Sequence, residues 1–295
     1  METQLSQETK DSTVSTLFPA GHYYSPIVDP ATVVPYYSRE RKRLCDDLGA
    51  IAIDQRSMCE LWKSWLAFGE PQFNETRAEG RRFFSNNGNY CFSDAAVLRA
   101  IIAENKPRRI VEIGSGNSTA CMLDTVDEFG LDETQLTCIE PYPHRLNAIM
   151  RPSDASRVDI IKKPVQDVPL SVFAELNAND ILFIDSTHVL KTGSDVHFEL
   201  FHILPILADG VLVHFHDCPF PFEYPPKWVL QENRSWNEVY ALRAFLMYNK
   251  AFNVVFWTTL MVTAYSELLR ETMPRMLENP IGSGIWLRKS MKASE

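Results

Sequence analysis

Short apolar runs alternate with helical patterns through the middle of the chain. Mostly apolar runs, long enough for buried strands, lie at 110–113, 136–139, 158–161, 181–184 and 211–215. Helical stretches separate them at 118–129, 143–150, 170–176 and 195–207. Repeated alternation of this kind predicts an α/β fold with a doubly wound, mostly parallel sheet.

Both ends of this region extend the pattern. A helix is predicted from Ser93, a capping residue, to a point before Pro107. The C-terminal part adds helices at 236–248 and 264–273 and strands at 254–258 and 284–288. The last two strands need no crossover helix if they form an antiparallel pair at one edge of the sheet.

The first ninety residues follow other patterns. Residues 1–17 are rich in Ser, Thr, Gln and Glu, which predicts disorder, and residues 18–37 mix proline and tyrosine as in an extended segment. A helical stripe occupies 53–68, formed by Met58, Leu61, Trp62, Trp65 and Leu66. Large apolar residues in such a stripe favour burial in the core, with a lid or a dimer surface as the alternative.

The most informative segment is 109–119, Arg-Ile-Val-Glu-Ile-Gly-Ser-Gly-Asn-Ser-Thr. Its apolar run predicts a buried strand, and Gly114 and Gly116 allow a sharp turn that lies directly against a ligand. Asn117 or Ser118 then caps the following helix, whose N-terminal amides face the ligand. The segment therefore predicts a nucleoside site at the end of this strand.

Three interpretations of this segment compete. A dinucleotide site requires a third glycine where this chain has Thr119, and an ordinary glycine-rich turn requires no ligand at all. Glu112 favours the third interpretation, since it would repel a pyrophosphate but could hold the ammonium group of a methionine moiety, directly or through water. We therefore expect S-adenosylmethionine as the ligand.

Composition narrows the range of partners. The chain has 295 residues, a formal net charge of -9 and a hydrophobic share of 45%. The charge argues against nucleic acid and anionic membranes, because both are bound through basic clusters. A small-molecule substrate is the expectation.

Cysteine spacing and hydropathy predict the compartment. The six cysteines, Cys45, Cys59, Cys91, Cys121, Cys138 and Cys218, include no Cys-x-x-Cys pair, which favours reduced thiols in a cytoplasmic protein. The polar start resembles no signal peptide, and the most apolar segment, 252–265, is too short to span a membrane.

Polar residues follow each predicted strand, where ligands of parallel sheets bind. Glu140 follows the second strand and can accept hydrogen bonds from both ribose hydroxyls, the alternative being an exposed strand-terminal acid. Asp167 follows the third and either binds an adenine amino group or caps the next helix.

The fourth and fifth strand ends carry the expected chemistry. Asp185 and Asp217 would lie side by side, and a divalent ion such as Mg²⁺ would relieve their repulsion. His188 can take a proton from an acceptor hydroxyl near neutral pH, the alternative being a surface or capping histidine. His214 and His216 share a face; His216 is a candidate ligand or base, and His214 is expected to be hydrogen-bonded inside the sheet.

The stretch from about Ser93 to Arg288 resembles the class I S-adenosylmethionine-dependent methyltransferases, with 112–116 matching their glycine-rich motif. The resemblance implies a seven-stranded, Rossmann-like sheet with its last strand antiparallel. The resemblance leaves out the first ninety residues, so we expect three parts: a disordered tail at 1–17, an extension or cap at 18–90 and the methyltransferase domain at 91–295. Implied cofactor-binding residues are Glu112, Gly114, Ser115, Gly116, Asn117, Ser118, Glu140, Asp167 and Asp185.

More narrowly, 185–188 and 193–195 resemble small-molecule O-methyltransferases of the catechol and macrolide-sugar types. That resemblance implies Asp185 and His188 as catalytic residues and Asp185 and Asp217 as metal ligands, and His216 is a further candidate ligand. The chain departs from it at Cys218, where a second acid or amide is usual, so that His216 or Glu223 would have to complete the metal shell.

The expected function is methyl transfer from S-adenosylmethionine to a small-molecule oxygen. The loop at 218–228, rich in proline and aromatic residues, would cover an apolar acceptor or exclude water. Alternatives are transfer to nitrogen, sulfur or carbon, a non-catalytic S-adenosylmethionine-binding protein, and a metal hydrolase or oxygenase built on His188, His216 and Asp217. A homodimer is a further expectation.

Overall fold

The computed structural model describes residues 17–37 and 48–290. These residues form two compact units, 17–37 with 225–235 and 48–224 with 236–290. The tail predicted to be disordered therefore lies, except for Leu17, outside the described residues. Residues 48–90, assigned by sequence to the N-terminal extension, belong to the unit that contains the sheet.

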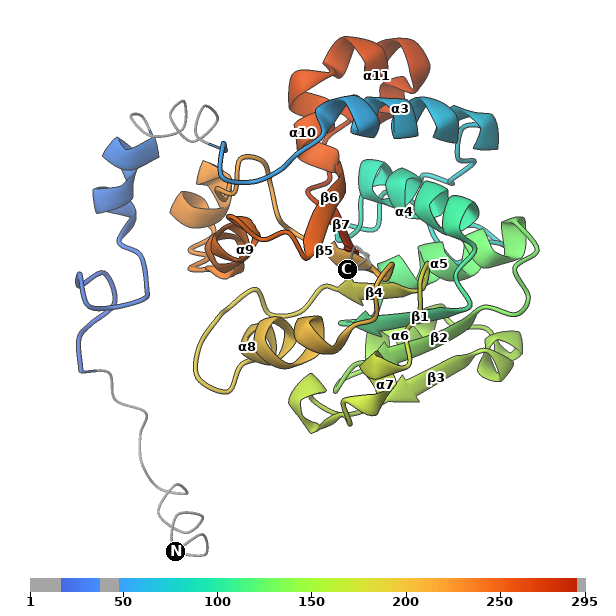
Figure 1. Ribbon diagram of the computed structural model, residues 1–295, viewed down its shortest axis with the longest axis horizontal. Helices are drawn as coiled ribbons and strands as arrows, with labels where there is room; N and C mark the ends of the chain where they lie inside the picture. Colours follow the sequence, from blue (N-terminus) through green and yellow to red (C-terminus); the bar gives the residue numbers. More distant parts are fainter. Residues whose placement is uncertain (1–16, 38–47, 291–295) are drawn as a thin grey trace, which may run out of the picture. The chain divides into compact units, whose positions relative to one another are not determined.

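Seven strands of the larger unit form one sheet, in the order β3-β2-β1-β4-β5-β7-β6 (Figure 1). The strands are β1 Arg109–Ile113, β2 Gln135–Ile139, β3 Val158–Ile161, β4 Ile181–Ile184, β5 Leu212–Phe215, β6 Phe252–Trp257 and β7 Ile285–Lys289. Strands β1 to β5 pair in parallel, and β7 pairs antiparallel with both β5 and β6. The prediction of a doubly wound, mostly parallel sheet with an antiparallel last strand is confirmed.

Helices fill the connections between the strands. They are α3 Gln55–Trp65, α4 Phe92–Asn105, α5 Asn117–Glu128, α6 His144–Ile149, α7 Ser171–Ala174, α8 Asp195–Phe198, α9 Glu238–Leu246, α10 Thr258–Ala264 and α11 Ser266–Thr272. The helical stretch predicted at 195–207 runs from 195 to 206, but only α8 is α-helical, since it passes into a π-helical turn at Glu199–Ile203 and a 3₁₀ turn at Leu204–Ile206. Pro205 explains the end, because its ring cannot continue a regular helix.

The smaller unit corrects one expectation. Residues 30–37 are helical, where the sequence predicted an extended segment. Asp29 caps this helix by accepting a hydrogen bond from the amide of Ala31 at 2.9 Å, and Pro30 suits the first helical turn. The Asp29-Pro30 pair is a local signal for a helix start, and it was overlooked because the segment has no apolar periodicity.

Strand register sets the position of the candidate site. Every residue of β4 and β5 is buried, which accounts for their continuous apolar runs. Ile113 pairs with Ile184, and Ile184 pairs with Phe215. The residues that follow β1, β4 and β5 therefore come together at the carboxyl edge of the sheet, where ligands of this fold class bind.

A buried charge cluster fastens the segment before α4 to the domain. The Arg82 guanidinium donates to Asp124 at 2.9 Å, to Asp127 at 2.7 Å and to Asp154 at 2.9 Å. Arg157 adds a second cation that pairs with Asp127 and Asp154. Because each of these acids has a guanidinium partner, burial of the cluster stabilises one arrangement of the segment.

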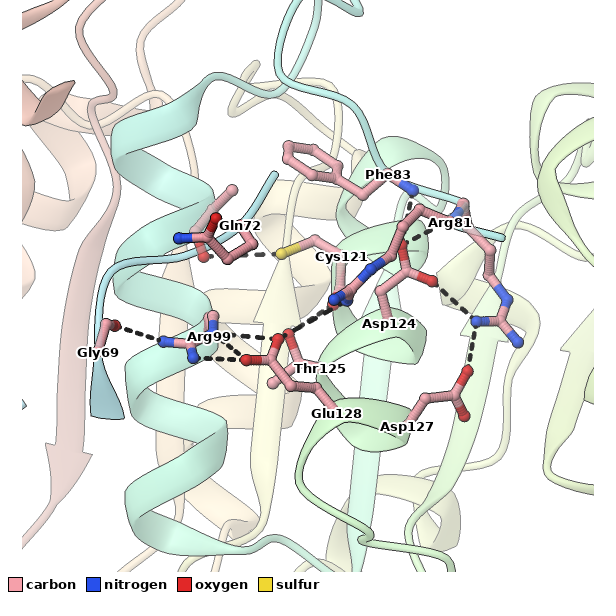
Figure 2. Close-up of polar contacts among 12 residues, drawn as sticks. Gly69, Gln72, Arg81, Phe83, Arg99, Cys121, Asp124, Thr125, Asp127 and Glu128 are labelled. Carbon is pink, nitrogen blue, oxygen red and sulfur yellow. Dashed lines mark hydrogen bonds and ion pairs between the residues drawn. The ribbon is translucent and has the colours of Figure 1, made fainter. Parts of the chain in front are cut away.

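Arg99 of α4 makes a second attachment, and Figure 2 shows its side chain between Glu128 and Gly69. Its guanidinium lies 2.6 Å from Glu128 and donates to the carbonyl of Gly69 at 3.1 Å and of Phe68 at 3.0 Å. These bonds tie the end of the α3 segment to α4 and α5. Around β6, the rings of Trp62 and Trp65 pack on Phe256, which confirms a core role for the predicted stripe.

Within the described residues, no helix is both long and apolar enough to cross a membrane. The apolar segment at 252–265 forms β6 and α10 instead.

Candidate active site

The first strand end is a glycine turn that packs against the end of β4. Gly114 has a φ of +81°, in the left-handed region that favours glycine. A Cβ at this position would lie 1.8 Å from the carbonyl oxygen of Asp185. The amide of Gly114 donates to Ile139, and that of Asp185 donates to Ile113. The turn therefore joins the ends of β1, β2 and β4.

Glu112 lies beneath this turn, fully buried. Its two carboxylate oxygens accept hydrogen bonds from the hydroxyls of Ser118 and Thr119, each at 2.5 Å. Burial raises the pKa of Glu112 to about 7, although the hydroxyl hydrogen bonds oppose the shift. Thr119 in turn accepts from the amide of Gly116 at 3.0 Å. Glu112 thus braces the turn through the first residues of α5, and Thr119 has a structural role that a third glycine could not fill.

The second and third strand ends present acids at the same edge. Glu140 is half-buried, and one of its oxygens accepts from the amide of Tyr142 at 2.8 Å. Asp167 is exposed in a 3₁₀ turn, Val165–Asp167, after β3. Glu140 follows the strand next to the glycine turn, whereas Asp167 lies one strand farther away.

His188 is the centre of the acidic cluster after β4. Its Nδ1 lies 2.8 Å from a carboxylate oxygen of Glu238, and both side chains are buried. Its Nε2 lies 3.5 Å from Asp185 Oδ1 and 3.9 Å from Asp217 Oδ2. The indole of Trp236 packs on the imidazole, with ring centres 4.4 Å apart. One ring nitrogen is thus held by α9, while the other faces the two strand-end acids.

The backbone around His188 is held in place by the start of α9. His188 has a φ of +61°, a conformation uncommon for a residue with a side chain. Its carbonyl accepts hydrogen bonds from the amides of Asn237 and Glu238 at 3.1 and 3.2 Å. The side chain of Asn237 also accepts from the amide of Leu190 at 2.6 Å. These bonds compensate for the strained backbone and fix the direction of the imidazole.

Charge sets the ionisation of this cluster. Burial lowers the pKa of His188, but Asp185 and Glu238 raise it more, so that it lies well above 6.5. Burial raises the pKa of Asp185, but His216 and His188 outweigh that effect, so that it lies below 3.8. The raised pKa of His188 and the lowered pKa of Asp185 thus each favour the charged form of the group beside its partner.

His216 forms a second arm of the cluster, reaching from β5 toward α4. Its Nε2 lies 3.7 Å from Asp217 Oδ1, and its Nδ1 lies 3.9 Å from Asp94 Oδ2. Burial opposes protonation of His216, but Asp185, Asp217 and Asp94 raise its pKa above 6.5. His214 lies inside the sheet, 3.5 Å from His216, and burial lowers its pKa well below 6.5.

The residues predicted as metal ligands belong to this same cluster. Over 17–37 and 48–290, no three His, Cys, Asp or Glu side chains have the spacing of a metal-ion site. Asp185, Asp217 and His216 come near one another, but Glu223 is engaged elsewhere, accepting from the hydroxyl of Tyr240 at 2.6 Å.

The aromatic loop after β5 is divided at Pro225. Its first part, up to Tyr224, belongs to the sheet unit, where Phe222 is buried with its ring 4.4 Å from that of Trp257. Trp228 belongs to the smaller unit, where Arg234 lies over its ring. Phe222 of this loop therefore packs in the core of the sheet unit.

Sequence reasoning missed the residues that position the two histidines. Glu238 lies fifty positions after His188, and its only signal was an acid in the first turn of a predicted helix. Asp94 directly follows Ser93, the predicted helix start, but it is buried, accepts from the amides of Ser283 and Gly284 and faces His216. Neither contact is visible in the sequence because each joins elements distant along the chain.

Comparisons with known proteins give the class. Residues 111–218 match a family described as a methyltransferase domain. An uncharacterized protein of Archaeoglobus fulgidus is 35% identical over 184 residues, which span 59% of this chain and 80% of that protein. The chain therefore belongs to the class I S-adenosylmethionine-dependent methyltransferase family and is an enzyme of that kind. This confirms the resemblance and excludes the dinucleotide, hydrolase and oxygenase alternatives.

Two solved structures illustrate the range of similar chains. The apo structure of CmcI has 19% identity and a TM-score of 0.44, covering 75% of this chain and 78% of its own. The O-methyltransferase TomG from Streptomyces achromogenes, involved in tomaymycin synthesis and solved with S-adenosylmethionine, has 13% identity and a TM-score of 0.43. That comparison covers 88% of this chain and 96% of TomG.

Proposed function

We propose that this methyltransferase acts on an oxygen atom of a small-molecule acceptor, with His188 as the general base. The observation that supports the proposal is the position of His188 Nε2, 3.5 Å from Asp185, whose own carbonyl touches the glycine turn. A proton acceptor is thereby held beside the place where the methyl donor is expected.

The residues at the carboxyl edge fit the donor. Gly114 and Gly116 leave the backbone of the turn without side chains, and Glu140 has an oxygen beyond its Tyr142 contact for ribose hydroxyls. When bound, S-adenosylmethionine supplies an electrophilic methyl group on its sulfonium. The residues that would hold it are those of the turn with its base and helix start, Glu112, Gly114, Ser115, Gly116, Asn117 and Ser118, together with Glu140, Asp167 and Asp185.

The chain's own contribution is positioning and proton transfer. His188 accepts the acceptor's hydroxyl proton at Nε2, while the carboxylate of Glu238 holds the Nδ1 hydrogen and thereby the tautomer. Asp185 and Asp217 flank the same nitrogen and stabilise the imidazolium that forms. Fixing both reactants at attack distance supplies much of the remaining rate enhancement.

We derive no step through a metal ion, because the described residues do not bring a ligand set together. Divalent-metal assistance through Asp185, Asp217 and His216 stays a prediction. Dialysis against a chelator, followed by Mg²⁺ addition, tests it by whether turnover falls and returns. The cytoplasmic location and the homodimer also stay predictions.

The test of the proposed function uses S-adenosylmethionine with an isotopically labelled methyl group and a panel of small hydroxylated acceptors. We expect label on an acceptor oxygen, with transfer lost in His188→Ala while S-adenosylhomocysteine still binds. Label on nitrogen, sulfur or carbon would assign a different acceptor atom. Full turnover by His188→Ala would remove His188 as the base.

A further inference from the structure

Arg145 of α6 lies over the glycine turn. A Cβ built on Gly116 would come 3.1 Å from Cδ of Arg145, 3.8 Å from its Cγ and 3.9 Å from its Nη1. The arginine stem therefore packs on the bare backbone of Gly116, and Arg145 is an exposed residue. The lack of a side chain at Gly116 therefore leaves room for Arg145.

Arg145 interacts electrostatically with Asp185 across the turn, without a close ion pair. Among the residues that the structure describes, no carboxylate lies within ion-pair distance of its guanidinium. Its charge reaches the site nevertheless: burial raises the pKa of Asp185, and Arg145 is among the cations, after His216 and His188, that lower it. Arg145 is thus a cation at the turn with which no carboxylate of 17–37 or 48–290 forms an ion pair.

The methyl donor carries one anionic group that the acids of this edge would repel. Its methionine end has an ammonium and a carboxylate next to the sulfonium. Glu112, Glu140 and Asp185 suit the cationic parts, but a carboxylate beside them requires a cation. Lys162 and Lys163 follow β3, two strands from the turn in the sheet order. Arg145 is the cation at the turn itself.

We propose that Arg145 binds the α-carboxylate of S-adenosylmethionine. This inference rests on the proposed function. A guanidinium matches a carboxylate with two parallel hydrogen bonds, a geometry that lysine cannot reproduce. Arg145 thereby makes the site specific for donors and products that retain the amino-acid carboxylate.

The experiment measures binding, so that turnover plays no part in it. Isothermal titration gives the Kd of S-adenosylmethionine and of decarboxylated S-adenosylmethionine, which keeps the sulfonium and lacks only the carboxylate. The proteins are the wild type, Arg145→Gln, Arg145→Lys and Arg108→Gln. Arg108 is the matched control, an exposed arginine just before β1 at the amino end of the sheet. Thermal melting verifies that each variant is folded.

We expect Arg145→Gln to weaken S-adenosylmethionine about 10- to 100-fold, the range of a charge-assisted hydrogen bond. The affinity for the decarboxylated donor should stay the same or rise, since a positive charge has been removed beside a cationic ligand. Arg145→Lys should fall between wild type and Arg145→Gln, and Arg108→Gln should bind both ligands as the wild type does.

Equal weakening of both ligands in a folded Arg145→Gln protein would overturn the inference, because Arg145 would then shape the turn without reading the carboxylate. An unchanged Kd for S-adenosylmethionine would overturn it as well. If the wild type bound neither ligand, the proposed function itself would fail, an outcome separate from both.

Discussion

Two buried charge clusters lie in the same unit and behave in opposite ways. Around Arg82, guanidinium groups face three aspartates, and the pKa values of Asp127 and Asp154 lie below 3.8 because Arg82 outweighs the effect of burial. Around His188, three carboxylates face one imidazole, whose pKa is raised. A guanidinium keeps its proton at any physiological pH, whereas an imidazole exchanges it. The first cluster suits permanent structure, and the second suits proton transfer.

The largest effect of a substitution is expected at Arg82, on the free energy of unfolding. Arg82→Met leaves Asp124 and Asp154 buried without their main cation, and breaking such a pair costs about 3–5 kcal/mol of the free energy of unfolding. Urea denaturation measures the loss. Arg108→Met, which removes a side chain that is 84% exposed, should change stability by less than about 1 kcal/mol. A small loss in Arg82→Met would contradict the structural role.

The next effect is expected at His188. His188→Ala should lower kcat about 10²- to 10⁴-fold, the range of a lost general base, while the Kd for S-adenosylhomocysteine stays near the wild-type value. His202→Ala, which removes an exposed histidine after α8, is the control and should retain full activity. Equal activity in the two variants would show that His188 has no role in proton transfer, and the proposed difference between the two clusters would then be wrong.

A smaller effect is expected in the pH dependence of kcat/KM. The base must be neutral, and its pKa is raised, so the rate should rise with pH and reach half its maximum above pH 6.5. Glu238→Gln removes one of the charges that raise this pKa, and the rise should move to lower pH. A profile that keeps its midpoint in Glu238→Gln would mean that a different group titrates.

The smallest effect is expected in acid stability. Because the pKa values of Asp127 and Asp154 are lowered on folding, their contribution is complete above their ordinary values and is lost as pH falls through the lowered ones. Wild-type stability should therefore fall below about pH 4, and Arg82→Met should lose less over the same range. Parallel denaturation curves of the two proteins from pH 6 to pH 3 measure the difference. Equal losses of stability in the two proteins would mean that groups outside the Arg82 cluster cause the acid sensitivity.

Local patterns were sufficient for the sheet. The strand runs from 110 to 184 agree with the structure within one residue, because continuous apolar stretches bounded by polar residues leave few alternatives. The glycine turn and the acids after each strand were likewise readable, since parallel pairing places all strand ends at one edge.

Contacts between distant elements were beyond these patterns. Arg82 stood in a loop with no periodicity, and only the fold shows that Asp124 and Asp154, more than forty residues away, surround it. Nothing in the sequence distinguishes Glu238 from the other acids, because only the position of α9 in the fold places it beside His188. The helix at 30–37 was missed for another reason, since residues 18–37 have no apolar periodicity and the local capping signal of Asp29 was overlooked.

The contact between Gly114 and Asp185 has a mechanical consequence. With 1.8 Å between the carbonyl oxygen and the place of a missing methyl group, the two backbones cannot slide past each other independently. A side chain at position 114 would push directly on the peptide that carries Asp185, an acid that flanks His188.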